Sequence, residues 1–278
     1  MPEPAPFRRF LVLLRGNFSP EPGARRIITA LLIGAVVHSI FAIAVVSMIV
    51  GMFFGMSRAF GSVPALWHWL ANAALLLQFP LAHSLLLNGR GPRIVARIVP
   101  GQYGGTLATS TFAIIASLQL AALFLLWTPS GIVWWQPDGA IFAALCTAYA
   151  ASWLLLIKAS IDAGAEVQSG ALGWMSMLQE IKPRYPDMPR TGLFRIIRQP
   201  IYVSFALTTW TVPVWTPDQL LLASVFTAYC LLAPVLKERR FRARYGAKFD
   251  AYQAKVPYAV PRFTAGSPAP NPSSRDHG

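Results

Sequence analysis

The chain has 278 residues, of which 55% are hydrophobic and 13% are charged, and its mean hydropathy is +0.48. A soluble core does not need this much apolar surface, so the composition excludes an ordinary soluble protein and predicts a polytopic membrane protein. The net charge of +13 does not indicate a nucleic-acid partner, because the lysines and arginines lie between apolar stretches and not on a soluble face.

The amino-terminal third predicts an anchor followed by two membrane spans. Residues 1–26 mix five arginines with bulky apolar side chains, a pattern typical of an interfacial helix. Residues 27–54 predict the first span, because roughly 20 apolar residues at about 1.5 Å each cross a hydrocarbon core of about 30 Å. Residues 65–87 predict the second span. We expect residues 88–105, which are rich in arginine and glycine, to form a polar, turn-rich connection.

The rest of the chain predicts further spans separated by polar segments. The third and fourth spans are predicted at 106–127 and 141–157, and a long polar segment follows them at 158–198. Two more apolar stretches, 201–215 and 219–236, predict a helical hairpin. The chain is therefore divided into four regions. These are a cytoplasmic interfacial amino terminus (1–26), four transmembrane helices (27–157), a region with the cytoplasmic segment and the hairpin (158–263), and a disordered Pro- and Ser-rich tail (264–278).

The lysines and arginines alternate between the segments that join the predicted spans. Of the 24, 23 fall in alternate segments and only Arg58 falls in the others. This positive-inside pattern predicts that both termini are cytoplasmic, and we expect a multi-pass protein of the bacterial inner membrane. We therefore predict an all-α, polytopic transmembrane helical bundle of five to six spans with a carboxyl-terminal hairpin. Six spans and five spans plus a re-entrant hairpin give the same sidedness.

Few side chains inside the predicted spans carry chemistry. His38 and His83 lie at depths that differ by roughly 10 Å, a poor arrangement for two ligands of one metal, so no metal site is predicted. We expect His38 to make a hydrogen bond between helices and His83 to lie at the depth of a cytoplasmic pocket, where it contacts substrate. Cys146 and Cys230 fall in apolar stretches and support neither a disulfide framework nor a zinc site.

Two polar clusters flank the predicted hairpin. One is 198–202 and the other is 237–240. Both must lie on the same side of the membrane, because two passes return the chain to its starting face. The arginines in and near these clusters are also suited to anionic lipid headgroups. The sequence therefore predicts a pocket at the membrane surface.

The residues of these clusters resemble a known family. The stretch 198–204 reads Arg-Gln-Pro-Ile-Tyr-Val-Ser and resembles an Arg-His-Pro-x-Tyr-x-Gly motif. The stretch 237–239 reads Lys-Glu-Arg and resembles a Glu-Glu-Arg motif, with Gly246 and Tyr252 following as in the family. The family is the membrane methyltransferases related to isoprenylcysteine carboxyl methyltransferase. Residues 78–84 add a particular likeness to its methanethiol S-methyltransferase group.

The resemblance implies a cofactor, an acceptor and roles for residues. The cofactor is S-adenosylmethionine, bound on the cytosolic side, and the acceptor is a small thiol or a lipophilic carboxylate or thiol that approaches through the membrane. Tyr202 and Arg239 would be catalytic, and His83 would contact substrate. The residues that would bind the cofactor are Arg198, Gln199, Pro200, Tyr202 and Glu238.

This sequence departs from the family pattern at two charged or titratable positions. Gln199 replaces the motif histidine and cannot titrate, although its amide still forms hydrogen bonds. Lys237 replaces the first glutamate and reverses its charge. An ammonium about 5 Å from the cofactor's sulfonium would repel it by roughly 3 kcal/mol at an effective dielectric of about 20. Either Lys237 points towards lipid phosphate, or cofactor binding is altered or lost.

Two other classes of function remain open at this point. One is a non-catalytic or haem-binding membrane protein of related architecture, in which His38 or His83 would hold the haem. The other is a lipid-binding or transport accessory. The expected partners are a small lipophilic acceptor and membrane lipids, with no nucleic acid and no obligate protein partner.

Overall fold

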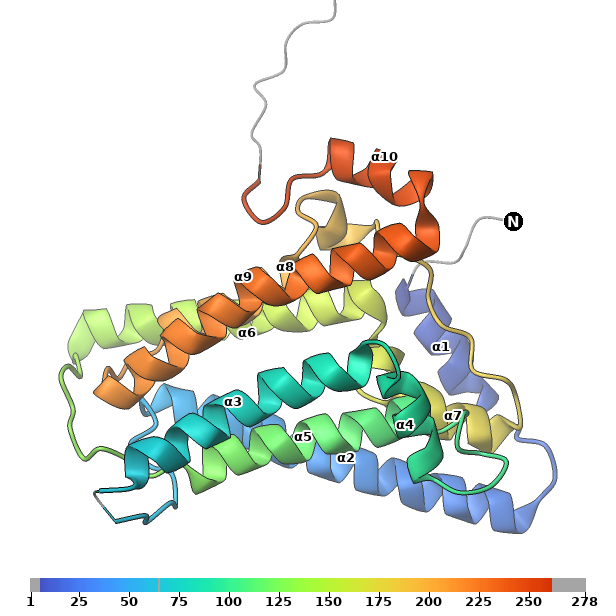
Figure 1. The fold of residues 1–278 in the computed structure, drawn as a ribbon, viewed down its shortest axis with the longest axis horizontal. Helices are drawn as coiled ribbons and strands as arrows, with labels where there is room; N and C mark the ends of the chain where they lie inside the picture. The colour runs from blue at the N-terminus through green and yellow to red at the C-terminus, as the bar shows by residue number, and fades with distance from the viewer. Residues whose placement is uncertain (1–5, 65, 262–278) are drawn as a thin grey trace, which may run out of the picture.

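The computed structural model describes residues 6–64 and 66–261, and these form a helical bundle (Figure 1). This confirms the predicted all-α, polytopic fold. The tail predicted to be disordered, 264–278, lies outside the described residues. The helices are α1 Pro6–Gly16, α2 Ala24–Phe53, α3 His68–Leu87, α4 Gly91–Ile98, α5 Ala108–Leu126, α6 Gly139–Gln168, α7 Ala171–Gln179, the 3₁₀ helix η1 Gly192–Arg195, α8 Pro200–Trp210, α9 Pro217–Tyr245 and α10 Ala247–Lys255.

Five of the described helices are long and apolar enough to cross a membrane. They are α2, α3, α5, α6 and α9. Their positions agree with predicted spans, except that α6 continues to Gln168 where the prediction ended at residue 157, and α9 continues to Tyr245 where the prediction ended at residue 236. The first turn of the α6 extension is supported by Lys158 and Asp162, which lie four residues apart and pair at 2.5 Å, and Gly164 then kinks the helix with a φ of 105°. The first part of the predicted polar segment is therefore helical.

Two segments predicted as polar connections contain helices. The connection at 88–105 holds α4, which Pro92 begins at a first-turn position where its missing N–H costs nothing. The segment 158–198 holds α7, most of whose residues are buried. Composition did not reveal either helix, because each is short and the surrounding glycines and arginines dominate the pattern.

The chain between the two polar clusters crosses the bundle by a short helix and an irregular stretch. Helix α8 has 11 residues and is only about 16 Å long. Residues 211–216 then continue to the far end, where Trp215 forms an antiparallel bridge with Trp135 of the α5–α6 loop. Helix α9 returns from there. Together, α8 and residues 211–216 make one passage from end to end.

One end of the bundle carries most of the short helices. We call it the polar end, defined by α1, α4, α7 and α10; in Figure 1 the first three lie at the right and α10 lies at the top, above the end of α9. The loops at the other end carry Trp134, Trp135 and Trp215. The main apolar core lies between the long helices, and its most deeply buried large members are Met52, Met56, Leu76, Leu123, Phe124, Trp127, Leu222 and Phe226. Because the long helices pack around this core, their ends are held in fixed positions at the polar end.

Candidate functional site

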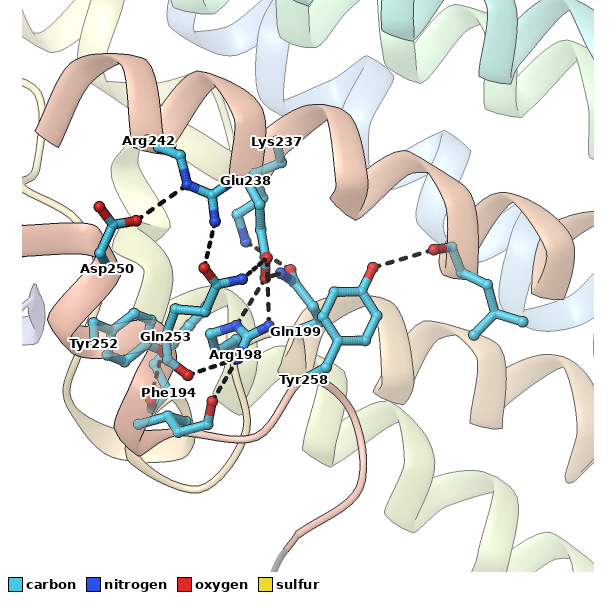
Figure 2. Close-up of polar contacts among 12 residues, drawn as sticks. Phe194, Arg198, Gln199, Lys237, Glu238, Arg242, Asp250, Tyr252, Gln253 and Tyr258 are labelled. Atoms are coloured by element: carbon cyan, nitrogen blue, oxygen red, sulfur yellow. Dashed lines mark hydrogen bonds and ion pairs between the residues drawn. The ribbon is translucent and has the colours of Figure 1, made fainter. Parts of the chain in front are cut away.

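The two polar clusters of the sequence meet at the polar end (Figure 2). Arg198 and Gln199 precede α8, which Pro200 begins at its first position, and Glu238 lies in the last third of α9. Arg198 Nε donates to Glu238 Oε1 at 2.9 Å, and Gln199 Nε2 donates to the same oxygen at 2.6 Å. Gln253 Nε2 donates to Glu238 Oε2 at 3.2 Å. The Glu238 carboxylate is thus the centre of a buried network.

The same cluster holds the chain that follows α10. Arg198 donates from its backbone N to Pro257 O at 2.9 Å and from Nη1 to Val256 O at 2.6 Å. The backbone N of Gln199 donates to Tyr258 O at 3.1 Å. The residues of the first motif therefore fasten the carboxyl-terminal segment to the mouth of the α8–α9 pair.

Tyr252 joins α10 to the same place from the other side. Its hydroxyl donates to Phe194 O at 2.7 Å. Burial raises the pKa of Tyr252 to about 12, so the phenol is neutral at physiological pH and keeps its donor proton. Helix α10 and η1 are held together by this contact.

Lys237 points into the site and not towards lipid. Its Nζ donates to Gln199 Oε1 at 3.1 Å. Three aromatic rings surround the ammonium at centroid distances of 5.4, 5.7 and 5.5 Å, and they belong to Phe194, Tyr202 and Phe241. We call these three rings the aromatic cage. Each face attracts a cation, so the cage stabilises a positive charge at its centre.

The cavity at the centre of this arrangement is small. Its volume is about 10 Å³, enough for about one water molecule. It is lined by Pro189, Phe194, Arg198, Gln199, Lys237, Glu238, Phe241, Phe249 and Tyr252. The cavity beside Lys237 therefore has room for nothing larger than a water molecule.

The structure brings together five of the seven residues predicted for the site. Arg198, Gln199 and Glu238 line the cavity, Tyr202 belongs to the aromatic cage, and Pro200 begins α8. Their contacts are all with the protein itself, and their roles towards a cofactor stay predictions.

The other two predicted residues lie apart from the cavity. Arg239 is exposed and makes no hydrogen bond or ion pair within the described residues, because one helical step turns it about 100° from Glu238. His83 packs against Phe79 and Phe112 at centroid distances of 5.1 and 5.0 Å. Its buried Nδ1 has no hydrogen-bond partner in the described part of the chain. The roles predicted for Arg239 and His83 are not tested by this geometry.

His38 makes the hydrogen bond between helices that was predicted. Its Nε2 accepts from Trp174 Nε1 at 3.1 Å, which joins α2 to α7. Gly34 on α2 leaves room for the same indole, since a Cβ there would lie 2.8 Å from Trp174 Cδ2.

Several residues of the site were not predicted. Phe194 and Phe241 complete the aromatic cage, and Gln253 contacts the central carboxylate. The position of Phe241 four residues after Lys237 was a usable signal, because side chains at that spacing share a helix face. Phe194 and Gln253 have no such signal, since only the folding of distant segments brings them to α9.

Known proteins resemble this chain over most of its length. Methanethiol S-methyltransferase of Crocosphaera subtropica is 28% identical over 194 residues, which cover 69% of this chain and 74% of that protein. Methanethiol S-methyltransferase of Pseudomonas deceptionensis is 25% identical over 208 residues, 74% of this chain and 76% of that protein. Nurim of Xenopus laevis is 30% identical over 206 residues, 68% of this chain and 69% of nurim. No family profile and no solved structure matches.

Proposed function

We infer that this chain is a methyltransferase. It belongs to the membrane methyltransferase family related to isoprenylcysteine carboxyl methyltransferase, and nurim and the methanethiol S-methyltransferases are its relatives in that family. The proposed donor is S-adenosylmethionine, and the proposed acceptor is a small thiol. The observation that carries this proposal is the aromatic cage beside Gln199 and Glu238.

The cage has the chemistry that a sulfonium cofactor needs. Three ring faces surround a position that already holds a cation, and aromatic cages bind onium groups of this kind. When bound, the cofactor supplies an electrophilic methyl group on its positive sulfur. Phe194, Tyr202 and Phe241 would hold that sulfur, and the buried Glu238 network would fix the position of Gln199 beside it.

Lys237 must leave the cage before a second cation enters. Two positive charges in one cage repel each other, and the cavity of about 10 Å³ leaves no room for both. The long stem of Lys237 allows its ammonium to reach the solvent while the stem stays packed. In this proposal Lys237 occupies the cation position in the free protein and withdraws when the cofactor binds.

The proposed acceptor follows from the names of the relatives and from the charge near the site. The relatives named above are methanethiol S-methyltransferases, so a small thiol is the acceptor class that we carry to this chain. Thiols react as thiolates, and a neighbouring cation favours the thiolate. Arg239 is an exposed cation next to Glu238, and we propose that it attracts the thiolate.

We propose that the polar end faces the cytoplasm of a bacterial inner membrane, with both termini there. The alternation of lysine and arginine along the sequence supports this orientation. A soluble cofactor would then reach the cavity directly, and the acceptor would arrive along the apolar helices.

The test is a binding and transfer experiment with the purified full chain. We expect S-adenosylmethionine to raise the melting temperature, because a ligand that binds only the folded state must stabilise it. We expect labelled methyl to reach methanethiol, and Tyr202→Ala, which removes one ring of the cage, to reduce transfer and cofactor affinity together. Absence of stabilisation and of transfer in the wild type and in Lys237→Met would overturn the proposal.

A second candidate is a non-catalytic member of the family. Two observations favour it: Lys237 fills the cage, and the Glu238 oxygens are already occupied by protein donors. It predicts no cofactor binding even when Lys237 is neutralised. The haem-binding form of this candidate predicts a Soret band that His83→Ala or His38→Ala removes.

A further inference from the structure

A second and much larger cavity lies at the polar end. Its volume is about 790 Å³, within the usual range for ligand sites. It lies between α1, the end of α6, α7 and the segment that follows α7, and it shares no lining residue with the small cavity. Its lining residues are Arg9, Val12, Leu13, Glu166, Leu172, Ser176, Gln179, Ile181, Lys182, Arg184 and Tyr185.

The floor of this cavity has unmet hydrogen-bonding capacity. Glu166 is 1% exposed and follows Gly164, whose φ of 105° breaks α6. One carboxylate oxygen of Glu166 pairs with Arg9, but Oε2 has no hydrogen-bond partner among the described residues. Ser176 is 0% exposed, and its hydroxyl is also without a partner there. Unsatisfied buried groups are costly, so the floor favours a ligand that brings hydrogen-bond donors.

The rim of the cavity has the opposite charge. Lys182 and Arg184 are exposed, and neither makes a hydrogen bond or ion pair within the part of the chain that the structure describes. Val12, Leu13 and Ile181 supply apolar surface to the same cavity. A matching ligand therefore carries a positive donor group, then a negative group, and then an apolar portion.

Helix α1 indicates where such a ligand comes from. It has no fully buried residue, and it exposes Phe7 and Val12 together with Arg8 and Arg15. Apolar and cationic side chains exposed on one helix are typical of a helix at the membrane interface. Gln179 holds α1 to α7 by donating to Leu13 O at 2.8 Å. The cavity thus has a helix of interfacial character as one wall, and we expect it to lie at the level of lipid headgroups.

We propose that this cavity binds the headgroup of an aminophospholipid such as phosphatidylethanolamine. The ammonium donates to Glu166 Oε2 and to Ser176 Oγ, which are the unsatisfied atoms of the floor. The phosphate lies towards Lys182 and Arg184, and the acyl chains follow the apolar side of α1 into the bilayer. Phosphatidylcholine has the same charges but no N–H donor, and phosphatidylglycerol has the phosphate but no ammonium.

The experiment compares lipids with identical acyl chains added to the purified, detergent-solubilised full chain. Bound lipid is counted by native mass spectrometry, and the melting temperature is measured in parallel. We expect phosphatidylethanolamine to bind and to raise the melting temperature, and phosphatidylcholine to do neither. Equal effects of the two lipids would overturn the proposal, and so would binding of phosphatidylglycerol alone.

Two sets of variants locate the site. Lys182→Ala/Arg184→Ala should weaken phosphatidylethanolamine binding about thirtyfold, since each cation near a lipid surface contributes modestly. Arg93→Ala/Arg97→Ala removes the same charge from exposed positions of α4 outside the cavity and should leave binding unchanged. Ser176→Ala removes an unsatisfied hydroxyl without disturbing a recorded contact, and it should reduce the preference over phosphatidylcholine. Unchanged binding in both cavity variants would refute the site.

A last comparison separates a lipid from a soluble ligand of the same chemistry. Free phosphoethanolamine carries the ammonium and the phosphate but no acyl chains. We expect it to bind far more weakly than the lipid. Equal affinity would assign the cavity to a soluble metabolite and would overturn the lipid proposal.

Discussion

Arg198 and Glu238 are 40 residues apart in the sequence, yet Arg198 Nε lies 2.9 Å from Glu238 Oε1. Their side chains are only 10% and 11% exposed, so water solvates neither charged group well. Glu238→Ala should therefore destabilise the protein by about 3–5 kcal/mol, the usual cost of leaving one partner of a buried pair uncompensated. The measurement is thermal or denaturant unfolding in detergent.

Arg239→Ala is the matched control for the unfolding measurement. It removes a charge from the next position of α9, which is exposed and makes no recorded contact within the described residues. We expect a change within about 0.5 kcal/mol. Equal destabilisation by both changes would show that the Arg198–Glu238 pair is not what holds this region.

Lys237→Met should increase the affinity for S-adenosylmethionine at least about tenfold. The change keeps the apolar stem and removes an ammonium that would repel the sulfonium by roughly 3 kcal/mol at about 5 Å. Calorimetry measures the affinity directly. Lys255→Met at the exposed end of α10 is the control for loss of one positive charge, and it should leave the affinity as in the wild type. Weaker binding by Lys237→Met would contradict competition for the cage.

Asp218→Ala should destabilise the opposite end of the bundle by about 3 kcal/mol or more, because it leaves buried donors without an acceptor. Asp218 is 1% exposed and accepts from Trp127 Nε1 and the backbone N of Ser130, both at 3.0 Å. It also lies in the first turn of α9, where a negative charge is favourable. Asp138→Ala, at an exposed aspartate before α6, should change stability little in the same unfolding assay. Similar losses in both variants would argue against a special role for Asp218.

Gly192→Ala should reduce stability by about 1–3 kcal/mol, the usual cost of a strained backbone position. Gly192 has a φ of 60°, and a Cβ there would lie 2.2 Å from Asp162 Oδ2. That oxygen accepts from the backbone N of Leu193 at 2.8 Å, so the methyl group would displace it and shift the chain that leads into α8. Gly105→Ala is the control, because nothing lies within 4 Å of its Cβ position. Equal melting temperatures for Gly192→Ala and the wild type would refute this reading.

The sequence alone predicted the long helices and the meeting of the two polar clusters. Hydrophobic length identifies a span whatever packs against it, which is why α2, α3 and α5 were found close to their true bounds. The topology of a hairpin is equally general, since a chain that crosses the membrane twice returns to its starting face. It correctly brought Arg198 near Glu238.

The sequence could not predict features that depend on contacts between distant segments. The sequence allowed Lys237 to point either to lipid or into the pocket, and its contacts with Gln199 and with Phe194 of η1 direct it into the pocket. The large cavity depends on Glu166, whose orientation follows from the break at Gly164 and from its pairing with Arg9 of α1. Neither arrangement leaves a periodic pattern along the chain.

The backbone contacts of Arg198 have a practical consequence for anyone who shortens this protein. Residues 256–258 supply carbonyl acceptors to Arg198 and Gln199, so they form part of the site although they lie near the end of the described chain. A truncation after Lys255 would remove these acceptors and leave a buried guanidinium partly unsatisfied. The shortest version that keeps the site intact must therefore extend beyond Tyr258.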